Sequence, residues 1–406
     1  MLPRLPAAGR SLPRAFRLLT REVLKLTKKQ YVFRGNLPTG QTLSACGRSF
    51  EAVLPDGQFY RQVSMARYSS KISNKHMVAV RFSSMGDVVL TTGVLLDWHE
   101  KHGTMFTVIT KEAFEPIFDH NPAVLNVIGF DENDLHGQTQ AMNFRGLMEK
   151  YRDSPLLDLH RNLRSAMLAR IWRDAIICYN KMSLARRLFL WSKGRFFGEE
   201  LRRYNVPQRY AIGLYDKQDV PSAAELRPRI FLTQDENTRA EELLAPLCAE
   251  GAPLVALHPF ATHEAKTWPM DMWLRLAALL RREGISYFWV GQGQDVPEEE
   301  APRSFVNKTG LRELFALTAA ADVLVTGDSG PMHIATAVGT PALALFGPTC
   351  REWGFFPSGE KDRVVQLDMP CRPCSLHGSG SCPRGNACIT GIEPERILEE
   401  LKSMLA

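Results

Sequence analysis

The sequence predicts an α/β protein built from two doubly wound, Rossmann-like domains that face a cleft. Strand-sized apolar runs alternate with helical patterns along most of the chain, which is typical of parallel sheets covered on both faces. The alternation is interrupted by a polar stretch at residues 215–229, which contains Pro221 and Pro228 and is typical of a linker. Ligands of such sheets bind beyond the carboxyl ends of the strands, so we expect functional motifs directly after strands.

The alternation starts at Met77, where a buried strand begins at once, and it continues to about Leu214 before it resumes after the linker. A helical stretch is expected between the second and third strands. The expected strands are residues 78–82, 105–109, 124–130, 156–159, 254–258, 285–290, 323–326 and 342–346. The other expected helices are residues 87–102, 236–250, 271–283, 311–320, 332–338 and 393–405.

These patterns divide the chain into two domains and three connecting or terminal parts. Residues 77–214 are expected to form the first domain and residues 230–390 the second, which includes a Cys-rich loop at residues 371–388. Residues 391–406 contain an amphipathic closing helix. Residues 1–76 form a basic extension.

Composition excludes several classes of protein. Of 406 residues, 45% are hydrophobic and 23% charged, which excludes a mainly disordered, collagen-like or coiled-coil protein. No apolar run approaches the ~18–20 residues that a transmembrane helix needs, so no transmembrane segment is expected. Residues 77–406 hold 36 Lys or Arg and 41 Asp or Glu. Nucleic-acid binding would require basic clusters in this folded part; we find none there and expect no nucleic-acid partner.

Residues 1–76 differ from the rest, with 14 Lys or Arg and 3 Asp or Glu. Three interpretations fit this composition: an Arg-rich transit peptide, a basic arm that touches anionic lipid, or sequence upstream of the true start. The abrupt change at Met77 favours the last of these. We therefore expect the extension to be disordered or not native.

The first motif is Ser-Ser-Met-Gly-Asp-Val at residues 83–88, where a small-residue turn leads from a strand into a helix. Asp87 lies at the N-terminus of that helix, facing the expected cleft. It is either a helix cap, a common role of aspartate, or a general base. The N–H groups of the turn can also bind an anion, but the chain contains neither GxGxxG nor a P-loop, so a dinucleotide or Walker-type site is unsupported.

Two motifs in the second domain predict a phosphate site. In residues 258–269, a polar loop after a strand carries Thr262 and Lys266. The lysine is either an ordinary solvated side chain or a mobile point charge for phosphate. Further on, a buried strand runs into Gly-Asp-Ser-Gly and a helix follows. The N–H groups at that helix N-terminus, the Ser329 hydroxyl and the missing side chain of Gly330 suit an anion.

Two other polar residues follow strands of the second domain. His333 lies about one turn into the helix that follows Ser329, and it either packs between helices or contacts a ligand. Asp295 follows Gly-Gln-Gly-Gln after another strand. It either accepts hydrogen bonds from ribose hydroxyls or caps the next helix.

The Cys-rich loop contains four of the eight cysteines, namely Cys371, Cys374, Cys382 and Cys388. The N-terminus is a poor secretory signal, and in a reducing cytoplasm clustered thiols are more often metal ligands than disulfides. The first pair has the spacing of zinc sites, whereas the second does not. The loop therefore either holds a small structural metal, for which zinc is the candidate, or contains four reduced thiols.

Together these motifs resemble glycosyltransferase family 9, the ADP-heptose:lipopolysaccharide heptosyltransferases, from Met77 to the C-terminus. The resemblance rests on the turn at residues 83–88, on His-Pro at residues 258–259 with Lys-Thr-Trp-Pro at residues 266–269, and on Asp-Ser-Gly-x-x-His at residues 328–333. Each piece alone is weak, but three pieces in order, each after a strand, are specific. The resemblance implies the two-domain GT-B fold.

The resemblance also implies a reaction: inverting, metal-independent transfer of a heptose from ADP-heptose to the core of lipopolysaccharide. No cofactor is required, and the enzyme would be cytoplasmic and peripheral at the cytoplasmic face of the inner membrane. Asp87 would take the proton of the acceptor hydroxyl. Asp328 would bind donor sugar hydroxyls or support its loop, with His333 nearby, and Asp295 would contact the ribose. The groups that would stabilise the departing diphosphate are Thr262, Lys266, Ser329 and the Gly330 N–H.

Two functions of other classes stay open at this point. A sugar-nucleotide epimerase of GT-B-like fold would need acid and base groups around the sugar but no acceptor surface. A non-catalytic module would only bind the sugar nucleotide. An activity assay on Asp87→Ala separates both from a transferase.

Overall fold

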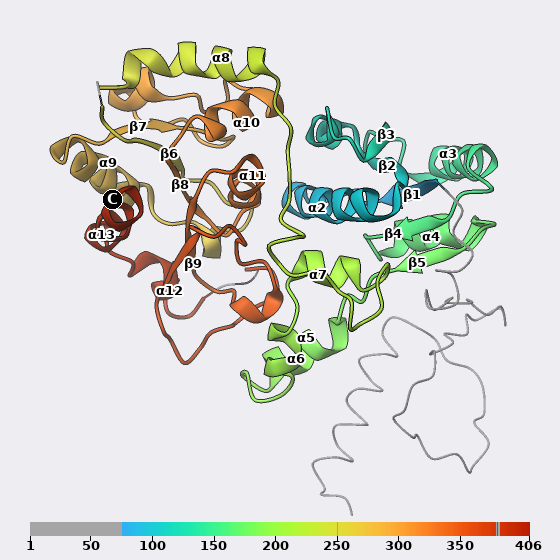
Figure 1. The fold of residues 1–406 in the computed structure, drawn as a ribbon. Helices are drawn as coiled ribbons and strands as arrows, with labels where there is room; N and C mark the ends of the chain where they lie inside the picture. The colour runs from blue at the N-terminus through green and yellow to red at the C-terminus, as the bar shows by residue number, and fades with distance from the viewer. Residues whose placement is uncertain (1–74, 250, 379, 381) are drawn as a thin grey trace, which may run out of the picture. The chain divides into compact units, whose positions relative to one another are not determined.

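The structure, a computed structural model, describes residues 75–249, 251–378, 380 and 382–406. The described residues belong to one compact unit, which contains two five-stranded sheets (Figure 1). All strand pairs within both sheets are parallel. The predicted α/β class with two doubly wound sheets is confirmed. The expectations for residues 1–74 lie outside the described residues.

The first sheet has the strand order β3-β2-β1-β4-β5. Its strands are β1 His76–Val80, β2 Met105–Lys111, β3 Val124–Phe130, β4 Leu156–Asp158 and β5 Ile176–Cys178. The helices around this sheet are α2 Met85–His102, the 3₁₀ helix η2 Glu112–Phe118, α3 Gly137–Lys150, α4 Leu163–Ile171, α5 Ser183–Trp191, α6 Gly198–Arg202 and α7 Val206–Ala211. The first strand begins at His76, earlier than expected, because the backbone of His76 pairs with Met105 of β2. The His76 ring also contacts Ser154 and Thr107 on the neighbouring segments.

The second sheet has the strand order β10-β9-β8-β6-β7. Its strands are β6 Leu254–His258, β7 Ser286–Trp289, β8 Val323–Gly327, β9 Ala342–Phe346 and β10 Arg363–Gln366. The α-helices are α8 Gln234–Leu244, α9 Met270–Arg282, α10 Leu311–Ala319, α11 Gly330–Val338, α12 Ala387–Thr390 and α13 Pro394–Leu405. Four short 3₁₀ helices accompany them: η3 Ala245–Leu247, η4 Glu264–Lys266, η5 Glu298–Arg303 and η6 Arg351–Trp353. Helix α8 ends before residue 250 because Pro246 follows it in η3.

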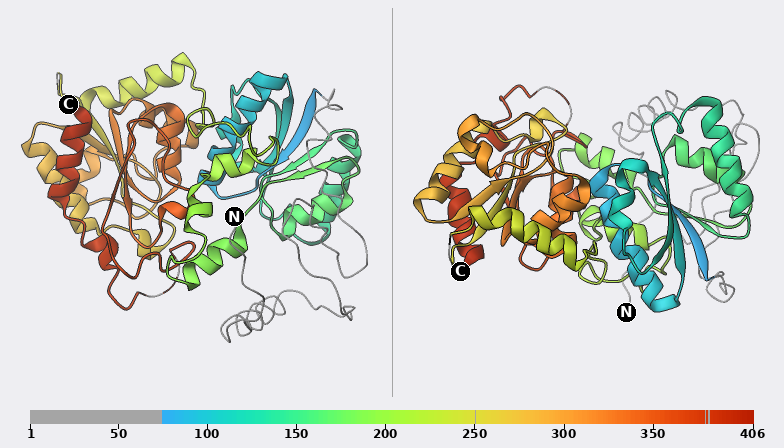
Figure 2. Two further views of the ribbon diagram at one scale, coloured as in Figure 1. Left: turned by 60° about the horizontal axis from the view of Figure 1, so that its bottom comes forward. Right: turned by 90° about the horizontal axis from the view of Figure 1, so that it is seen from above.

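Both faces of the second sheet are buried, which explains its continuous apolar strands. Val255 and Leu257 point to the face that α9 and α13 cover, whereas Leu254 and Ala256 point to the core with α10 and α11. Figure 2 shows helices on both sides of this sheet. No helix in the described part of the chain is long and apolar enough to cross a membrane.

The strand order places the carboxyl ends of two strand pairs at switch points, where ligands bind in doubly wound sheets. In the first sheet, the chain continues from β1 to β2 on one side and from β4 to β5 on the other, so the switch point lies between β1 and β4. In the second sheet, the switch point lies between β6 and β8. The residues that follow β1, β6 and β8 are therefore the ones that the fold positions for ligand contact.

The linker at residues 215–229 packs along α2. The backbone N–H of Arg229 donates to Thr92 Oγ1 at 2.9 Å, and Tyr215 Oη donates to Asp97 Oδ2 at 2.5 Å. Gly93 permits this approach, because a Cβ there would lie 2.3 Å from the Arg227 carbonyl oxygen. The segment between the two sheets is therefore fixed against the helix that carries Asp87.

Candidate active site

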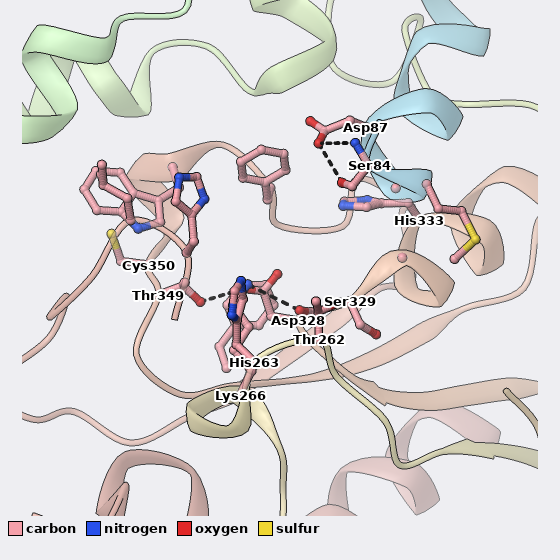
Figure 3. Close-up of a pocket in the computed structure, with 18 residues that line it drawn as sticks. Ser84, Asp87, Thr262, His263, Lys266, Asp328, Ser329, His333, Thr349 and Cys350 are labelled. Atoms are coloured by element: carbon pink, nitrogen blue, oxygen red, sulfur yellow. Dashed lines mark hydrogen bonds and ion pairs between the residues drawn. The ribbon is translucent and has the colours of Figure 1, made fainter. Parts of the chain in front are cut away.

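One pocket lies at both switch points, with a volume of about 430 Å³ (Figure 3). Its walls come from the N-terminus of α2, the loop after β6, the loop between β8 and α11, and the segments after β9 and β10. The lining residues are Ser84, Met85, Gly86, Asp87, Thr262, His263, Lys266, Asp328, Ser329, Gly330, His333, Phe346, Thr349, Cys350, Trp353, Phe355, Leu376 and His377. This size is within the range of pockets that bind small ligands.

The N-termini of α2 and α11 meet in this pocket. A Cβ on Gly86 would lie 2.8 Å from the His333 ring and 3.3 Å from Gly330 Cα. A Cβ on Gly330 would lie 2.4 Å from Met85 Cε. The absence of side chains at both glycines therefore allows the two helices to approach. Two helix N-termini, each with a partial positive charge, then face the same space and favour an anion there.

Asp87 is both a capping residue and a pocket residue. Ser84 is the N-cap of α2. Asp87 Oδ2 accepts hydrogen bonds from the Ser84 backbone N–H at 3.3 Å and from the Ser84 hydroxyl at 2.8 Å. The same oxygen pairs with the Arg81 guanidinium at 2.8 Å. The other oxygen, Oδ1, accepts from Tyr210 Oη at 3.2 Å. Oδ1 therefore has more free acceptor capacity than Oδ2, and it is the oxygen better placed to receive a further proton.

The charge around Asp87 keeps its carboxyl ionised. Burial alone would raise its pKa, but the Arg81 guanidinium and the two hydrogen bonds from Ser84 outweigh burial, so that the pKa lies below its usual value. An ionised carboxylate can accept a proton, although a lowered pKa makes it a weak base. Its position must therefore contribute much of any catalytic effect.

Lys266 forms a partly buried ion pair at the pocket wall. Its Nζ lies 2.6 Å from Asp328 Oδ2, and that carboxylate also accepts from Thr349 Oγ1 at 2.7 Å. The aliphatic part of Lys266 packs against Gly378, where a Cβ would lie 2.8 Å from Lys266 Cγ. Asp328 and the Cys-rich loop thus hold the ammonium group at the pocket wall, on the other side from Asp87 (Figure 3).

Neutral histidines support the Ser329 end of the pocket. Ser329 Oγ lies 3.1 Å from Thr326 Oγ1, which in turn lies 3.0 Å from His258 Nδ1. Burial lowers the pKa of His258 to about 4. It also lowers the pKa of His333 to about 4, against the opposing effect of Asp328 and Asp87. Both rings are therefore neutral near pH 7, and the positive charge at the pocket comes from Lys266 and the helix N-termini.

The structure brings together most of the site residues expected from the sequence. The pocket contains Asp87, Thr262, Lys266, Asp328, Ser329, Gly330 and His333. Asp295 lies outside it, exposed in the loop after β7, where its Oδ1 accepts from Asn307 Nδ2 at 2.9 Å. Its contact with a ribose stays a prediction.

Several groups that line the pocket or contact Asp87 were not expected from the sequence. Arg81 directly follows β1, which ends at Val80, whereas the sequence pattern places Arg81 inside the strand expected at residues 78–82. No local sequence signal marks Tyr210, in α7, or Trp353, in η6. His377 comes from the Cys-rich loop, and its pKa is lowered by burial and by the neighbouring cations Arg186 and Lys266.

The four cysteines of the Cys-rich loop are free thiols that lie near one another. The pKa of Cys374 is raised by burial and then by the neighbouring Cys371 and Cys382. In the residues that the structure describes, no group of three or more His, Cys, Asp or Glu side chains is arranged to hold a metal ion. The structural metal stays a prediction.

Comparison with known proteins matches residues 144–380 to glycosyltransferase family 9 (heptosyltransferase). These residues include Lys266 and the segment 328–333, whereas Asp87 lies before them. Among solved structures, the ADP-heptose lps heptosyltransferase II of E. coli has a TM-score of 0.62 at 22% identity, with 81% of this chain and 98% of that chain covered. This similarity confirms the GT-B fold.

Two curated relatives show how far the sequence similarity extends. Lipopolysaccharide heptosyltransferase 2 of Salmonella typhimurium is 29% identical over an alignment of 218 residues, and the alignment covers 49% of this chain and 61% of the relative. Lipopolysaccharide heptosyltransferase 1 of Pseudomonas aeruginosa is 26% identical over an alignment of 360 residues, and the alignment covers 81% of this chain and 98% of the relative. The chain thus spans about six-tenths of the first of these relatives and nearly all of the second.

Proposed function

The chain belongs to glycosyltransferase family 9, since residues 144–380, more than half of its length, match that family; from this premise we propose that it transfers a heptose from ADP-heptose to the inner core of lipopolysaccharide. One observation carries the proposal: the ionised carboxylate of Asp87 and the ammonium of Lys266 face one pocket from two different sheets. An inverting transfer needs a base and a stabilised leaving group on opposite sides of the anomeric carbon.

On the acceptor side, Asp87 Oδ1 takes the proton of a sugar hydroxyl. The hydroxyl oxygen then forms a bond to the anomeric carbon of the donor, from the face opposite to the diphosphate. Tyr210 and Arg81 keep the carboxylate in one orientation through the contacts at 3.2 and 2.8 Å. This positioning compensates for the weak basicity of the group.

On the donor side, the bond between the anomeric carbon and the diphosphate oxygen breaks, and ADP leaves with the electron pair. Lys266 and the N–H groups at the start of α11 stabilise the charge that develops on the diphosphate. The hydroxyls of Ser329 and Thr262 line the same wall and can donate to phosphate oxygens. Asp328 orients Lys266 through their 2.6 Å ion pair. These groups supply the electrostatic role that a divalent cation has in other transferases.

The release of ADP tests this function. With ADP-heptose alone, the purified protein should release little ADP, and addition of a heptose-deficient lipopolysaccharide should increase the rate strongly. Release that does not depend on the acceptor would indicate hydrolysis. Conversion of the sugar nucleotide without any release would favour the epimerase. We further propose that the enzyme acts in the cytoplasm, peripheral to the inner membrane that carries its acceptor.

The Cys-rich loop yields a separate prediction, about metal. If the loop holds zinc, the purified protein should contain about one equivalent of metal by elemental analysis. Removal of the metal should lower thermal stability. It should also weaken ADP binding, because Gly378 of this loop packs against Lys266 and Leu376 and His377 line the pocket. A metal-free preparation with the same melting temperature and ADP affinity would show that the thiols are simply reduced.

A further inference from the structure

The exposed large apolar side chains of the described residues all lie in the first half of the chain. They are Leu125, Met142, Leu163, Met167, Ile171, Leu184, Trp191, Phe196 and Phe197. Four of them fall between residues 184 and 197, in α5 and in the turn that leads to α6. Large exposed apolar groups that gather in this way commonly mark an interaction surface.

Helix α5 has one packed face and one exposed face. Phe189 packs edge-to-face on Trp353, with ring centroids 5.6 Å apart, and Leu201 of α6 completes this small core. Leu184 and Trp191, which are 59% and 65% exposed, lie on the outer face. The inner contacts fix the helix, so Trp191 is exposed on a rigid element.

The turn after α5 exposes two further aromatic side chains. Phe196 and Phe197 are 53% and 41% exposed. The turn is ordered, because the backbone N–H of Phe196 donates to Ser192 Oγ at 3.1 Å. Phe197 has a φ of 65°, in the left-handed region that bulky residues rarely adopt. Backbone strain at an exposed phenylalanine that lacks a burial role often has a functional reason.

Exposed cations lie close in sequence to these aromatic residues. Residues 181–203 contain seven Lys or Arg and two Asp or Glu, a net charge of +5 within an otherwise acidic folded part. Arg187, Lys193 and Arg195 are exposed, and they form no ion pair within the described part of the chain. The net negative charge of residues 77–406 as a whole concealed this local cluster of Lys and Arg. The expectation of no basic cluster in the folded part is therefore wrong.

We propose that Trp191, Phe196, Phe197, Arg187, Lys193 and Arg195, hereafter the basic aromatic surface, dock on a bilayer that contains anionic phospholipid. Aromatic and aliphatic groups that project from a cationic face are typical of elements that lie in the membrane interface. The cations attract anionic headgroups, and the rings enter the boundary between headgroups and acyl chains. The inference deepens the proposed function, since it names the surface through which a lipid-linked acceptor is reached.

The position of α5 connects this surface to the pocket. Arg186, next to Arg187 on the same helix, is directed inward: burial lowers its pKa, and Tyr179 and Asp87 are near enough to oppose that shift. An α-helix is only ~10 Å across. The surface proposed to meet the membrane and a cation that interacts electrostatically with Asp87 therefore belong to the same helix.

Fluorescence quenching tests the docking on the full chain. Trp191 is 65% exposed, whereas none of the other six tryptophans is more than 7% exposed. A water-soluble quencher should therefore act mainly on Trp191. Vesicles of a zwitterionic lipid mixed with an anionic phospholipid should reduce this quenching severalfold, and high salt should restore it. A Trp191→Phe variant should lose the response. If the quencher failed to reach Trp191 even without lipid, another part of the protein would cover this side chain, and the proposal would be contradicted.

Vesicle co-sedimentation supplies a matched comparison. The triple variant Trp191→Ser/Phe196→Ser/Phe197→Ser should bind anionic vesicles at least about tenfold more weakly than the wild type. The control Leu125→Ser/Met142→Ser/Leu163→Ser removes three exposed apolar groups elsewhere and should bind normally. Equal binding by the triple variant, equal loss in the control, or protection by RNA as strong as by vesicles would each overturn the proposal.

An activity comparison separates this proposal from the proposed function. The triple variant should transfer heptose to a deacylated, soluble acceptor at the wild-type rate and to a vesicle-embedded acceptor much more slowly. If the wild type binds vesicles as described but transfers no heptose, the proposed function fails and the docking surface stands. If the variant is equally active on both acceptors, the docking proposal fails and the proposed function stands.

Discussion

Replacing Asp87 by Asn should lower kcat by roughly 10²–10⁴-fold while donor affinity barely changes. The amide has nearly the same size and can still accept a hydrogen bond from Ser84, but it cannot take a proton. Asp87 lies on α2 and contacts Arg81, Ser84 and Tyr210, which all belong to the part of the chain around the first sheet. Lys266 and Ser329, which are proposed to bind the donor, belong to the part of the chain around the second sheet. Steady-state rates and titration calorimetry with ADP measure the two effects separately.

Ser84→Ala is the matched control for this variant. It removes the hydroxyl that donates to Asp87 at 2.8 Å and so weakens the cap of α2, at a cost of ~1 kcal/mol in the free energy of unfolding. It leaves the carboxylate in place, so kcat should change far less than in Asp87→Asn. If Asp87→Asn kept near-normal kcat, Asp87 would be only a capping residue, and the base would have to be another group.

The lowered pKa of Asp87 also predicts the pH dependence of kcat. A general base is active above its pKa, where it is deprotonated. The pKa of an ordinary aspartate is ~3.9, and Arg81 and Ser84 keep that of Asp87 below its usual value against the effect of burial. Protonation of Asp87 should therefore reduce kcat only in strongly acidic solution. A loss of activity near neutral pH would have to come from another group.

Replacing Lys266 by Ala should both weaken donor binding and slow transfer. The ammonium contacts the diphosphate before and during departure of ADP, so its loss affects the ground state and the transition state together. Charge-assisted hydrogen bonds contribute about 1.5–3 kcal/mol, which corresponds to about 10–100-fold in ADP affinity. Loss of Lys266 also leaves Asp328 without its cation at 2.6 Å, which adds repulsion toward phosphate.

Lys361→Ala is the control for the loss of one positive charge. Lys361 is an exposed lysine of the second half that does not line the active-site pocket. The Lys361→Ala substitution should leave ADP affinity and kcat unchanged, whereas Lys266→Ala changes both. If Lys266→Ala bound ADP normally, the diphosphate would be held by the Ser329–Gly330 helix terminus without the lysine.

The sequence was sufficient for the fold class and for most of the pocket, because both depend on local patterns. Asp87, Lys266 and Ser329 each lie in the segment that directly follows a strand, namely β1, β6 and β8. In a doubly wound sheet the carboxyl ends of strands next to a switch point must share one edge. Strand identity therefore placed Lys266 and Ser329 of the second sheet near one another, whereas Asp87 follows a strand of the first sheet and was expected nearby because the two domains were expected to face one cleft.

The remaining parts of the site depend on contacts that no local pattern encodes. Tyr210 reaches Asp87 from a short helix 123 positions along the chain, and Thr349 reaches Asp328 from a loop. His377 enters the pocket from a Gly-rich segment without periodicity. Asp295 shows the opposite limit, because its strand β7 is displaced from the switch point, and its side chain lies outside the pocket.

The most direct test of the account is the mass of the acceptor after incubation with ADP-heptose. The purified full chain, ADP-heptose and a set of truncated lipopolysaccharides are incubated, and the products are read by mass spectrometry. We predict that one truncated acceptor gains the mass of a single heptose residue and that Asp87→Asn does not produce this species at a comparable rate. Consumption of ADP-heptose while every acceptor keeps its mass would contradict the account.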